Sequence, residues 1–424
     1  MLAEATVRAL REAGHSLFVV AASPPGFTCD TDGKPKEAQQ EFFLPVSSWY
    51  RLDISSPWQE FAAGCADATL SEKVLAFQPQ VVYGVDWSAL PPYEALFPAH
   101  LERPPFVWSA LRIFSFSDAA HKPLERAAAA AAAAVVALSP TDADYIRRRL
   151  QLRPEEGAPS VPIVQVRCPL RAAVTVAAAK APVGQLAPPR DLLLCCVRLA
   201  PEKEPHRFVA LVEALSASGA LRSAGVKPAM CVGQSRSEYG DDLIRRLKSA
   251  APDALIIDSF LDADALADLF QRTALNVHPP LYDTFGMSVV EAAAFGAPSL
   301  LHSGGMVGAT VAVRPAHGEA LEADLSSLSV GGPATEVEAA REVPATARLS
   351  PDGDAAATAA AAAEEGVKEL VGQMAALLLD LGHLAAVGAA AKARALAYGE
   401  ADHGAEVAEV LRAVVSSRET PPRS

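Results

Sequence analysis

The chain has 424 residues, of which 50% are hydrophobic and 21% are charged, and its formal net charge at pH 7 is −13. This length predicts two or more domains, each large enough to bury a core of its own. The acidic balance argues against non-specific binding to nucleic acid, although it is compatible with a local basic pocket for a diphosphate.

The first part of the chain, residues 1–180, alternates helical segments with buried strands. An amphipathic helix opens it, and the charged residues of that helix argue against a signal peptide. Strands are predicted at Ser16–Val20, Gln80–Val85, Phe106–Trp108 and Val135–Leu138, with helices at Ala127–Ala134 and Asp142–Leu150. The alternation is typical of a doubly wound parallel sheet. Val161–Leu170 and the Ala/Pro-rich stretch up to Pro189 are predicted to connect this domain to a second one.

A second α/β series is predicted over residues 190–320. Its strands are expected at Leu192–Val197, Ala229–Gly233, Ala254–Asp258 and Leu275–His278, with helices at Pro205–Ser216, Tyr239–Ala250 and Ala263–Arg272. Elements of this length match βα repeats. Residues 331–364 lose periodicity and are predicted to form a flexible insertion. The remaining part, 367–417, is predicted to form helices at Val367–Leu379, His383–Ala397 and Gly404–Val415.

The cysteines and the apolar segments indicate the compartment. The six cysteines form no C-x-x-C motif and show no spacing suited to zinc, so no metal site is predicted. Cys195 and Cys196 lie in an apolar run, where free thiols are the expected state. No run of about 20 uninterrupted apolar residues occurs, so no membrane span is predicted. The sequence therefore predicts a cytoplasmic protein.

Two cations follow the first strand of the second series. Arg198 and Lys203 lie five residues apart in a proline-broken loop. Arginine can bind a phosphate bidentately and lysine supplies a compact charge, so the pair suits a diphosphate leaving group. Taken alone, two solvated basic residues on a loop would be the simpler interpretation.

Two carboxylates lie further along the same domain. The segment Leu281–Gly305 places Asp283 and Glu291 eight residues apart, with a Phe-Gly turn and the start of a helix between them. Ser288 is the predicted N-cap of this helix, and Gly296 ends it. Backbone N–H groups at the start of a helix favour a phosphate, and carboxylates can bind sugar and ribose hydroxyls. The segment therefore suits a nucleotide-sugar.

The whole segment resembles the E-x7-E motif of retaining GT-B glycosyltransferases, in particular glycosyltransferase family 4, also called glycosyl transferases group 1. Its parts occur in order at family spacing, namely Phe285-Gly286, Glu291-Ala292, Gly296-Ala297-Pro298 and Ser303-Gly304-Gly305. Asp283 stands where the family usually has its first Glu. Arg198 and Lys203 resemble the cations of the family pattern G-R-L-x-x-x-K-G, with Val197 and Glu204 in place of its two glycines.

This resemblance implies two Rossmann-like, doubly wound α/β domains that face a central cleft, followed by C-terminal helices. It implies that Arg198 and Lys203 clasp the donor diphosphate, Glu291 accepts ribose hydroxyls and Asp283 holds hydroxyls of the donor sugar. Further substrate contacts are implied for Gly233, Phe285, Gly286, Met287 and Ser288 on the donor side and for Arg112 on the acceptor side. Two cations and a helix terminus carry the phosphate charge, so no metal or other cofactor is expected.

The implied reaction is that of a hexosyltransferase of class EC 2.4. It moves a sugar, with retention, from a nucleotide-diphosphate sugar to an unidentified acceptor, which is a glycan, a lipid or a small molecule. The sequence does not name the sugar, the nucleotide, the acceptor or the oligomeric state.

The resemblance also raises alternatives. In the family a strand and a glycine-rich turn precede the helix that opens this chain, so the first domain is expected to lack its first strand. Many members carry a His after the strand equivalent to Val81–Val85, and this chain has Asp86 there. A catalytically silent nucleotide-sugar-binding relative of the same fold therefore stays open, as does another type of GT-B enzyme. His278 occupies a family position near the site, although a structural histidine is the simpler interpretation.

Overall fold

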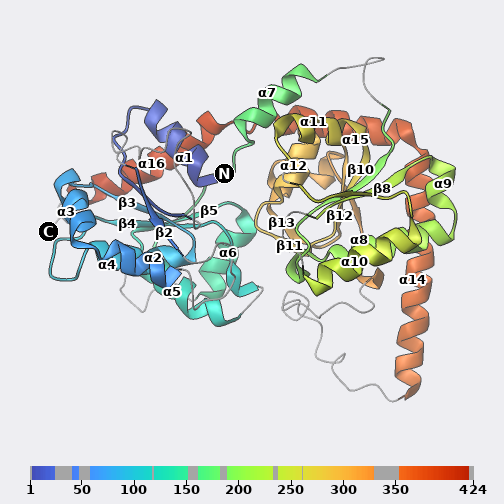
Figure 1. Ribbon diagram of the computed structural model, residues 1–424, viewed down its shortest axis with the longest axis horizontal. Helices are drawn as coiled ribbons and strands as arrows, with labels where there is room; N and C mark the ends of the chain where they lie inside the picture. The colour runs from blue at the N-terminus through green and yellow to red at the C-terminus, as the bar shows by residue number, and fades with distance from the viewer. Residues whose placement is uncertain are drawn as a thin grey trace. The chain divides into compact units, whose positions relative to one another are not determined.

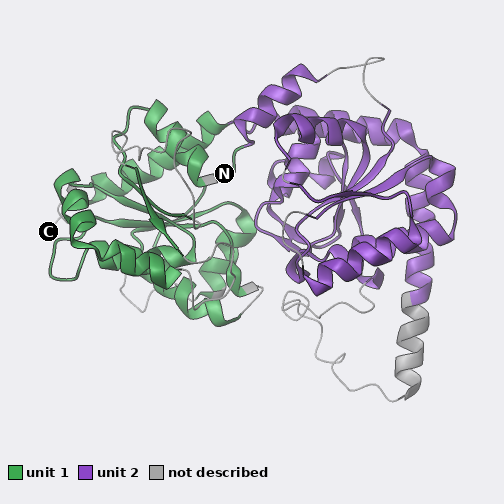
Figure 2. Ribbon diagram, in the orientation of Figure 1, with its two compact units in different colours: residues 1–169, 400–424 green, residues 170–399 purple. Residues whose placement is uncertain are grey.

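The computed structural model describes residues 2–23, 41–46, 58–116, 119–150, 161–181, 189–232, 237–259, 261–328 and 353–419. Contacts within the chain divide it into two compact units, as Figure 2 shows. The first comprises Met1–Pro169 and Glu400–Ser424, and the second comprises Leu170–Gly399. Each unit is built on parallel strands with helices packed around them.

The first unit contains two parallel sheets. In one, β1 (Val19–Ser23) pairs with β2 (Glu41–Pro45). The other has the order β3-β4-β5-β6, formed by Val82–Val85, Phe106–Ala110, Ala134–Ala137 and Ile163–Gln165. All residues of β4 and β5 are buried, which is what a parallel sheet covered on both faces requires.

The helices of the first unit include one from each end of the described chain (Figure 1). They are α1 (Leu2–Glu12), α2 (Trp58–Cys65), α3 (Ala68–Phe77), α4 (Leu90–Leu96), α5 (Lys122–Ala131), α6 (Pro140–Arg149) and α16 (Glu400–Glu419). A Cβ placed on Gly404 of α16 would lie 2.3 Å from the Cβ of Ala9 on α1, so these helices pack at close range. The Thr6 hydroxyl lies 2.8 Å from Nε2 of the buried His403. The last described helix therefore belongs to the first unit.

The second unit has a six-stranded parallel sheet of order β14-β12-β10-β7-β8-β9. The strands are β7 (Leu192–Cys196), β8 (Lys227–Cys231), β9 (Leu255–Ile257), β10 (Thr273–His278), β12 (Ser299–His302) and β14 (Leu321–Ala323). A small parallel pair, β11 (Tyr282–Asp283) with β13 (Met306–Val307), follows β10. In chain order, β8 pairs with one edge of β7 and β9 pairs with β8. The next strand, β10, pairs with the opposite edge of β7. The strand order therefore reverses between β7 and β10.

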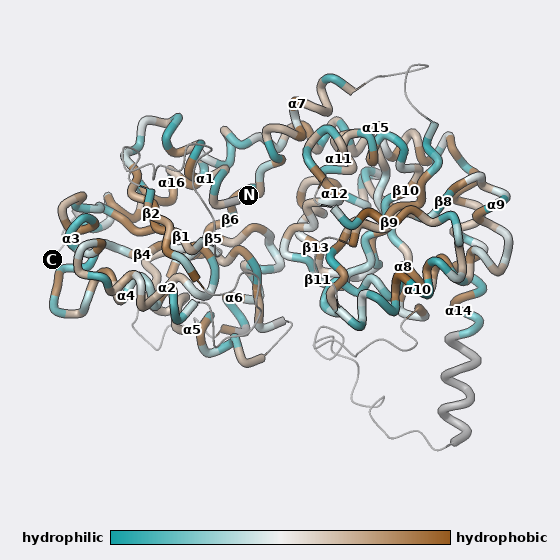
Figure 3. Tube along the Cα trace, viewed as in Figure 1, coloured by the Kyte–Doolittle hydropathy of each residue, from teal (hydrophilic) through white to brown (hydrophobic). Residues whose placement is uncertain are grey.

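The helices of the second unit cover both faces of this sheet (Figure 1). They are α7 (Ala172–Lys180), α8 (Pro205–Ala217), α9 (Ala220–Ala224), α10 (Glu238–Ala250), α11 (Ala263–Arg272), α12 (Met287–Ala294), α14 (Gly353–Leu379) and α15 (Leu381–Ala395). Helices α8, α9, α10 and α14 pack together, and so do α7, α11, α12 and α15. The strands between them are mainly hydrophobic in Figure 3 and form the buried core. Short 3₁₀ helices in the two units lie at Trp87–Ala89, Phe114–Phe116, Ala119–His121, Pro201–Lys203, Gly308–Val311, Pro315–His317 and Ser326–Leu328.

Most predicted elements occur, but three boundaries differ from the prediction. The first unit ends at Pro169 rather than at residue 180, because α7 packs against α11 and α12. Part of the predicted connection, Ile163–Gln165, forms the edge strand β6. The alanine run does not stay helical to its end, since α5 stops at Ala131 and β5 begins at Ala134.

The predicted flexible insertion, residues 331–364, is wrong over its second part. Residues 353–364 are helical and form the beginning of α14. Alanine is the strongest helix former and dominates this segment, which explains the helix. Residues 331–352 lie outside the described residues. No single helix of the described ranges is long and apolar enough to cross a membrane, and one bent pair, Glu364–Leu379 with Leu381–Ala395 at 81°, meets that test by length and composition only.

Candidate functional site

Arg198, Lys203 and Asp283 lie on two loops that meet where the strand order of the second unit reverses. Strand β7 ends at Cys196 and leads into the loop with Arg198 and Lys203, whereas β10 ends at His278 and leads into the loop with Asp283. In open α/β sheets, ligands bind beyond the carboxyl ends of the strands at such a point. The topology therefore places the two predicted motifs at the position expected for a ligand.

Lys203 and Asp283 form an ion pair across these loops. Nζ of Lys203 lies 2.7 Å from Oδ2 of Asp283, and the two side chains are 13% and 15% exposed. Nε2 of the buried His278 lies 3.4 Å from the same carboxylate oxygen. Burial alone would raise the pKa of Asp283, but the charge of Lys203 and the hydrogen bond from His278 hold it below its ordinary value. Asp283 is therefore ionised at neutral pH, and His278 lies within the site.

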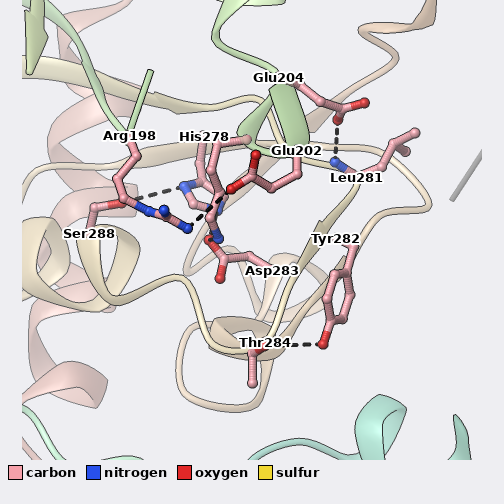
Figure 4. A network of polar contacts seen from close by, with 10 residues as sticks. Arg198, Glu202, Glu204, His278, Leu281, Tyr282, Asp283, Thr284 and Ser288 are labelled. Carbon is pink, nitrogen blue, oxygen red and sulfur yellow. Dashed lines mark hydrogen bonds and ion pairs between the residues drawn. The ribbon is translucent and has the colours of Figure 1, made fainter. Parts of the chain in front are cut away.

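The loop that carries Asp283 is fixed by its backbone. Tyr282 and Asp283 pair with Met306 and Val307 in the small sheet of β11 and β13. A Cβ on the next residue, Gly308, would lie 1.9 Å from the carbonyl oxygen of Thr284, so only glycine fits there. In Figure 4 the hydroxyls of Tyr282 and Thr284 also meet, 3.0 Å apart. The position of the Asp283 carboxylate thus depends on a close backbone crossing.

The turn before α12 differs from the prediction in its capping residue. Gly286, not Ser288, is the N-cap, and it adopts φ 77°, which glycine tolerates best. A Cβ there would lie 3.0 Å from Cγ1 of Val307 and 3.3 Å from Nε2 of His278. Ser288 instead directs its hydroxyl to Nδ1 of His278 at 3.4 Å (Figure 4). Phe285 is buried beneath the turn, and the first residues of α12, Met287 and Ser288, present backbone N–H groups at a helix start.

Glu291 lies inside α12 and pairs with Arg171, a residue that sequence reasoning missed. Nε of Arg171 donates to Oε1 of Glu291 at 2.6 Å, and the Glu291 side chain is 7% exposed. Burial raises the pKa of Glu291, and the charge of Arg171 opposes that shift. The two charges also act on the Cys196 thiol, which places this pair near the end of β7. Arg171 lies in a stretch interpreted as a connection, 120 residues from Glu291, so no local pattern indicated it.

Arg198 and Arg112 are not part of the contacts described above. Arg198 is 53% exposed and lies 3.2 Å from Glu202 on its own loop. Gly233 lies outside the described residues. Arg112 belongs to the first unit, where its guanidinium lies 5.2 Å from the centre of the Phe114 ring. Among the described residues, no group of three or more His, Cys, Asp or Glu side chains could hold a metal ion.

The first unit contains a second site feature that sequence reasoning did not identify. Asp86, directly after β3, has φ 76° and ψ 166°, a backbone region used essentially by glycine alone. Its carboxylate accepts a hydrogen bond from the Trp87 amide at 2.6 Å, and the Trp108 indole donates to its carbonyl oxygen at 2.9 Å. Burial raises its pKa to about 7, with Glu125 adding to the shift and Arg112 opposing it. Strain and a raised pKa together are typical of functional residues.

Glu125 is the second carboxylate of this feature, and it is fully buried. It accepts hydrogen bonds from the backbone of Phe114 and Ser115 and from the Ser115 hydroxyl. The Ser115 hydroxyl also lies 3.0 Å from that of Tyr145. Burial raises the pKa of Glu125 against the effect of these hydrogen bonds. Asp86 at the end of β3, the buried Glu125 and Arg112 therefore interact electrostatically, and an Asp directly after a strand was the available sequence signal.

Comparisons with known proteins show the fold. No family model matches the chain, and no curated protein matches it by sequence. A sucrose-phosphate synthase from Thermosynechococcus elongatus is 14% identical, with a TM-score of 0.63 over 97% of this chain and 92% of that chain. A trehalose-6-phosphate structure from E. coli bound with UDP-2-fluoro glucose is 13% identical, with a TM-score of 0.64 over 97% and 96%. An α,α-trehalose-phosphate synthase (UDP-forming) from Burkholderia xenovorans in complex with glucose-6-phosphate is 14% identical, with a TM-score of 0.55 over 83% and 78%.

This chain has the GT-B fold. The predicted α/β class, with two Rossmann-like units and C-terminal helices, is thereby confirmed. At sequence identities of 13% and 14%, these similarities show the fold alone. The chemistry of this chain is therefore argued from the residues of its site.

Proposed function

We propose that this protein is a glycosyltransferase that moves a sugar from a nucleotide-diphosphate sugar to an acceptor with retention. The observation that carries the proposal is the Lys203–Asp283 pair, 2.7 Å apart, at the reversal of strand order beside the start of α12. A half-buried cation suits the diphosphate, and the adjacent carboxylate suits hydroxyls of the donor sugar. The fold, shared with sugar-phosphate synthases, supports the same class.

The proposed mechanism uses these charges on the leaving group. As the bond between the anomeric carbon and the diphosphate breaks, negative charge accumulates on the phosphate oxygens. Lys203 and Arg198 would stabilise that charge, together with the backbone N–H groups at the start of α12. Asp283 would hold the donor sugar in place as Lys203 turns to the phosphate. Two cations and a helix terminus can carry this charge, so the proposal requires no metal ion or other cofactor.

Glu291 is the proposed ribose ligand. Burial raises the pKa of its carboxyl group, and Arg171, at 2.6 Å, opposes that shift and so favours the ionised form. The hydrogen bond to Arg171 also fixes the orientation of the carboxylate, which a pair of ribose hydroxyls requires. We therefore include Arg171 in the proposed donor site.

The acceptor is proposed to bind beside Asp86, Glu125 and Arg112 in the first unit. Carboxylates suit sugar hydroxyls, and an arginine suits a phosphate or another anion. A sugar phosphate is the first acceptor to test, because the Burkholderia xenovorans synthase structure contains glucose-6-phosphate. A glycan and a lipid remain the alternatives. The free thiols of the described cysteines support the expected reducing compartment.

Calorimetry with nucleotide-sugars tests the proposal. UDP-, GDP- and ADP-glucose would be titrated into the wild type and into the variants Arg198→Ala, Lys203→Ala and Glu291→Ala. Saturable binding of one donor, weakened at least about tenfold in each variant, is expected from the loss of charge-assisted contacts. Arg245→Ala is a matched control, since Arg245 forms an exposed ion pair with Asp242 on α10.

The same samples separate the active enzyme from its alternative. Release of nucleotide that accelerates on adding glucose-6-phosphate or another acceptor supports the transferase. Tight binding with no release under any acceptor supports a catalytically silent relative. A folded wild type that binds no nucleotide-sugar would contradict both.

A further inference from the structure

Glu204, the residue directly after Lys203, has an unusual backbone conformation. It adopts φ 49° and ψ 36°, in the left-handed region that favours glycine. It ends the 3₁₀ helix Pro201–Lys203 and stands at the N-cap of α8 without capping it through its side chain. A glutamate in a backbone conformation that favours glycine indicates that its side chain makes contacts that offset the strain.

The Glu204 side chain bridges two loops in the interior of the second unit. Oε2 accepts a hydrogen bond from the backbone amide of Leu281 at 2.6 Å, as Figure 4 shows. The residue is only 2% exposed. Leu281 lies on the loop after β10, two residues before Asp283, whereas Glu204 lies on the loop after β7. The bridge therefore joins the neighbours of the two residues that form the site ion pair.

A buried cation balances the charge of this carboxylate. Nη2 of Arg207 lies 3.3 Å from Oε1 of Glu204, and Nη1 of Arg207 donates to the carbonyl oxygen of Leu325 at 2.8 Å. Arg207 is itself fully buried on α8. The opposite charge of Arg207 offsets the cost of burying this carboxylate, and a carboxylate makes a stronger hydrogen bond to a backbone N–H than a neutral acceptor does.

We propose that Glu204 is a positioning residue that sets Lys203 against Asp283 for donor binding. The inference rests on the proposed function. One carboxylate ties the residue after Lys203 to the Leu281 amide, two residues before Asp283, so the bridge sets how far apart the two loops hold the site charges. Removing the bridge lets the two loops shift independently, and the donor diphosphate then meets Lys203 in several positions instead of one.

Two double variants separate the effect of losing the Glu204–Leu281 hydrogen bond from the effect of losing the Glu204–Arg207 ion pair. Replacing Glu204 alone would also remove the ion pair between Glu204 and the buried Arg207, so Arg207→Met is included in both. Glu204→Gln with Arg207→Met keeps an acceptor for the Leu281 amide, whereas Glu204→Gly with Arg207→Met removes it and suits the backbone. Binding of the donor found for the wild type is measured by calorimetry. The glutamine pair is expected to bind within about threefold of wild type and the glycine pair about tenfold more weakly.

A double-mutant cycle tests whether Glu204 acts through Lys203. If it does, the tenfold difference between the two pairs disappears in a Lys203→Ala background, because the loop has lost the charge that it positions. A purely structural role would weaken binding by the same factor in both backgrounds and would contradict the proposal. Thermal unfolding of each variant confirms that the folded fraction is comparable.

A control double variant and the Arg198→Ala variant distinguish a failure of the positioning role from a failure of the proposed function. Glu213→Gln with Arg246→Met removes another ion pair of α8, with contacts at 2.9 and 2.8 Å, and is expected to leave donor binding unchanged. If Arg198→Ala loses donor affinity while the glycine pair keeps it, the positioning role alone is overturned. If the wild type binds no nucleotide-sugar, the proposed function and the positioning role fall together.

Discussion

Nε of Arg171 donates a hydrogen bond across 2.6 Å to Oε1 of Glu291, so the carboxylate proposed to bind ribose is held by the second residue of the second unit. Burial raises the pKa of Glu291 and Arg171 opposes the shift. The ionised state of the proposed ribose ligand therefore depends on a residue outside its own motif.

Arg171→Leu should weaken donor binding in a pH-dependent way. Without the cation the pKa of Glu291 rises further, so a larger fraction of the carboxyl group is protonated at a given pH and accepts ribose hydroxyls less strongly. We expect about a tenfold loss of affinity at pH 7 that is recovered as the pH rises, whereas Arg171→Lys keeps most of the affinity. Calorimetry between pH 6 and 9 measures both, and an equal loss at every pH would contradict this role of Arg171.

Asp283→Asn should reduce sugar transfer by at least about a hundredfold, because it removes a negative charge from the reacting region and abolishes the ion pair with Lys203. It should also change acid stability. The pKa of Asp283 is lower in the folded than in the unfolded protein, so the unfolded chain takes up its proton first as the pH falls. The contribution of Asp283 is therefore complete above its ordinary pKa of about 3.9 and is lost below it. Urea unfolding of wild type and variant should converge below about pH 4, and a constant difference would argue against this linkage.

Two substitutions of Asp86 separate the effect of its backbone strain from the effect of its carboxylate charge. Asp86→Gly and Asp86→Ala both remove the carboxylate, but only glycine suits φ 76°, so the glycine variant should be about 1–2 kcal/mol more stable than the alanine variant. Urea unfolding at neutral pH measures this difference. Equal stabilities would show that the backbone relaxes without cost.

The Asp86 carboxyl group also predicts a pH dependence of opposite sign to that of Asp283. Its pKa is raised to about 7 in the folded state, so the folded protein holds the proton more tightly and wild-type stability should fall as the pH rises from about 4 to about 7. Both Asp86 variants should lose this decline. They should also lose transfer to an acceptor while they retain donor binding, since Asp86 lies in the first unit.

Gly308→Ala should impair the site through its backbone. The added Cβ would lie 1.9 Å from the carbonyl oxygen of Thr284, so the loop that carries Asp283 must move. We expect a loss of stability of roughly 1–3 kcal/mol and weaker donor binding. Gly372→Ala is the matched control, because nothing lies within 4 Å of its added Cβ in α14. That variant should be unchanged or up to about 1 kcal/mol more stable, with normal donor binding.

Local sequence patterns predicted the strands and the charged loops, because these features depend on residues that are neighbours in the sequence. The strands around Lys203 and Asp283 followed from apolar runs, and the two loops at the reversal of strand order contain the expected charges. Backbone geometry was not predictable in the same way. Gly286 rather than Ser288 caps α12 because the turn needs a positive φ, and the strain at Asp86 has no signature in composition.

Contacts between residues far apart in the chain could not be predicted from the sequence either. Arg171 meets Glu291 across 120 residues, and a single arginine in an apparent connection carries no pattern. Glu204 was noticed only as a departure from a glycine, and its bridge to Leu281 spans 77 residues. His278 was expected to be structural, yet it lies 3.4 Å from the Asp283 carboxylate.

The return of α16 to α1 means that the second unit is an insertion within the first. A fragment that stops near residue 169 would expose the face of α1 that Gly404 and His403 cover. The chain leaves and re-enters the first unit at neighbouring points, because the amide of Leu170 donates to the carbonyl oxygen of Tyr398 at 2.9 Å. A few glycine and serine residues joining 169 to 400 would therefore replace the whole second unit and yield the first as a single continuous chain.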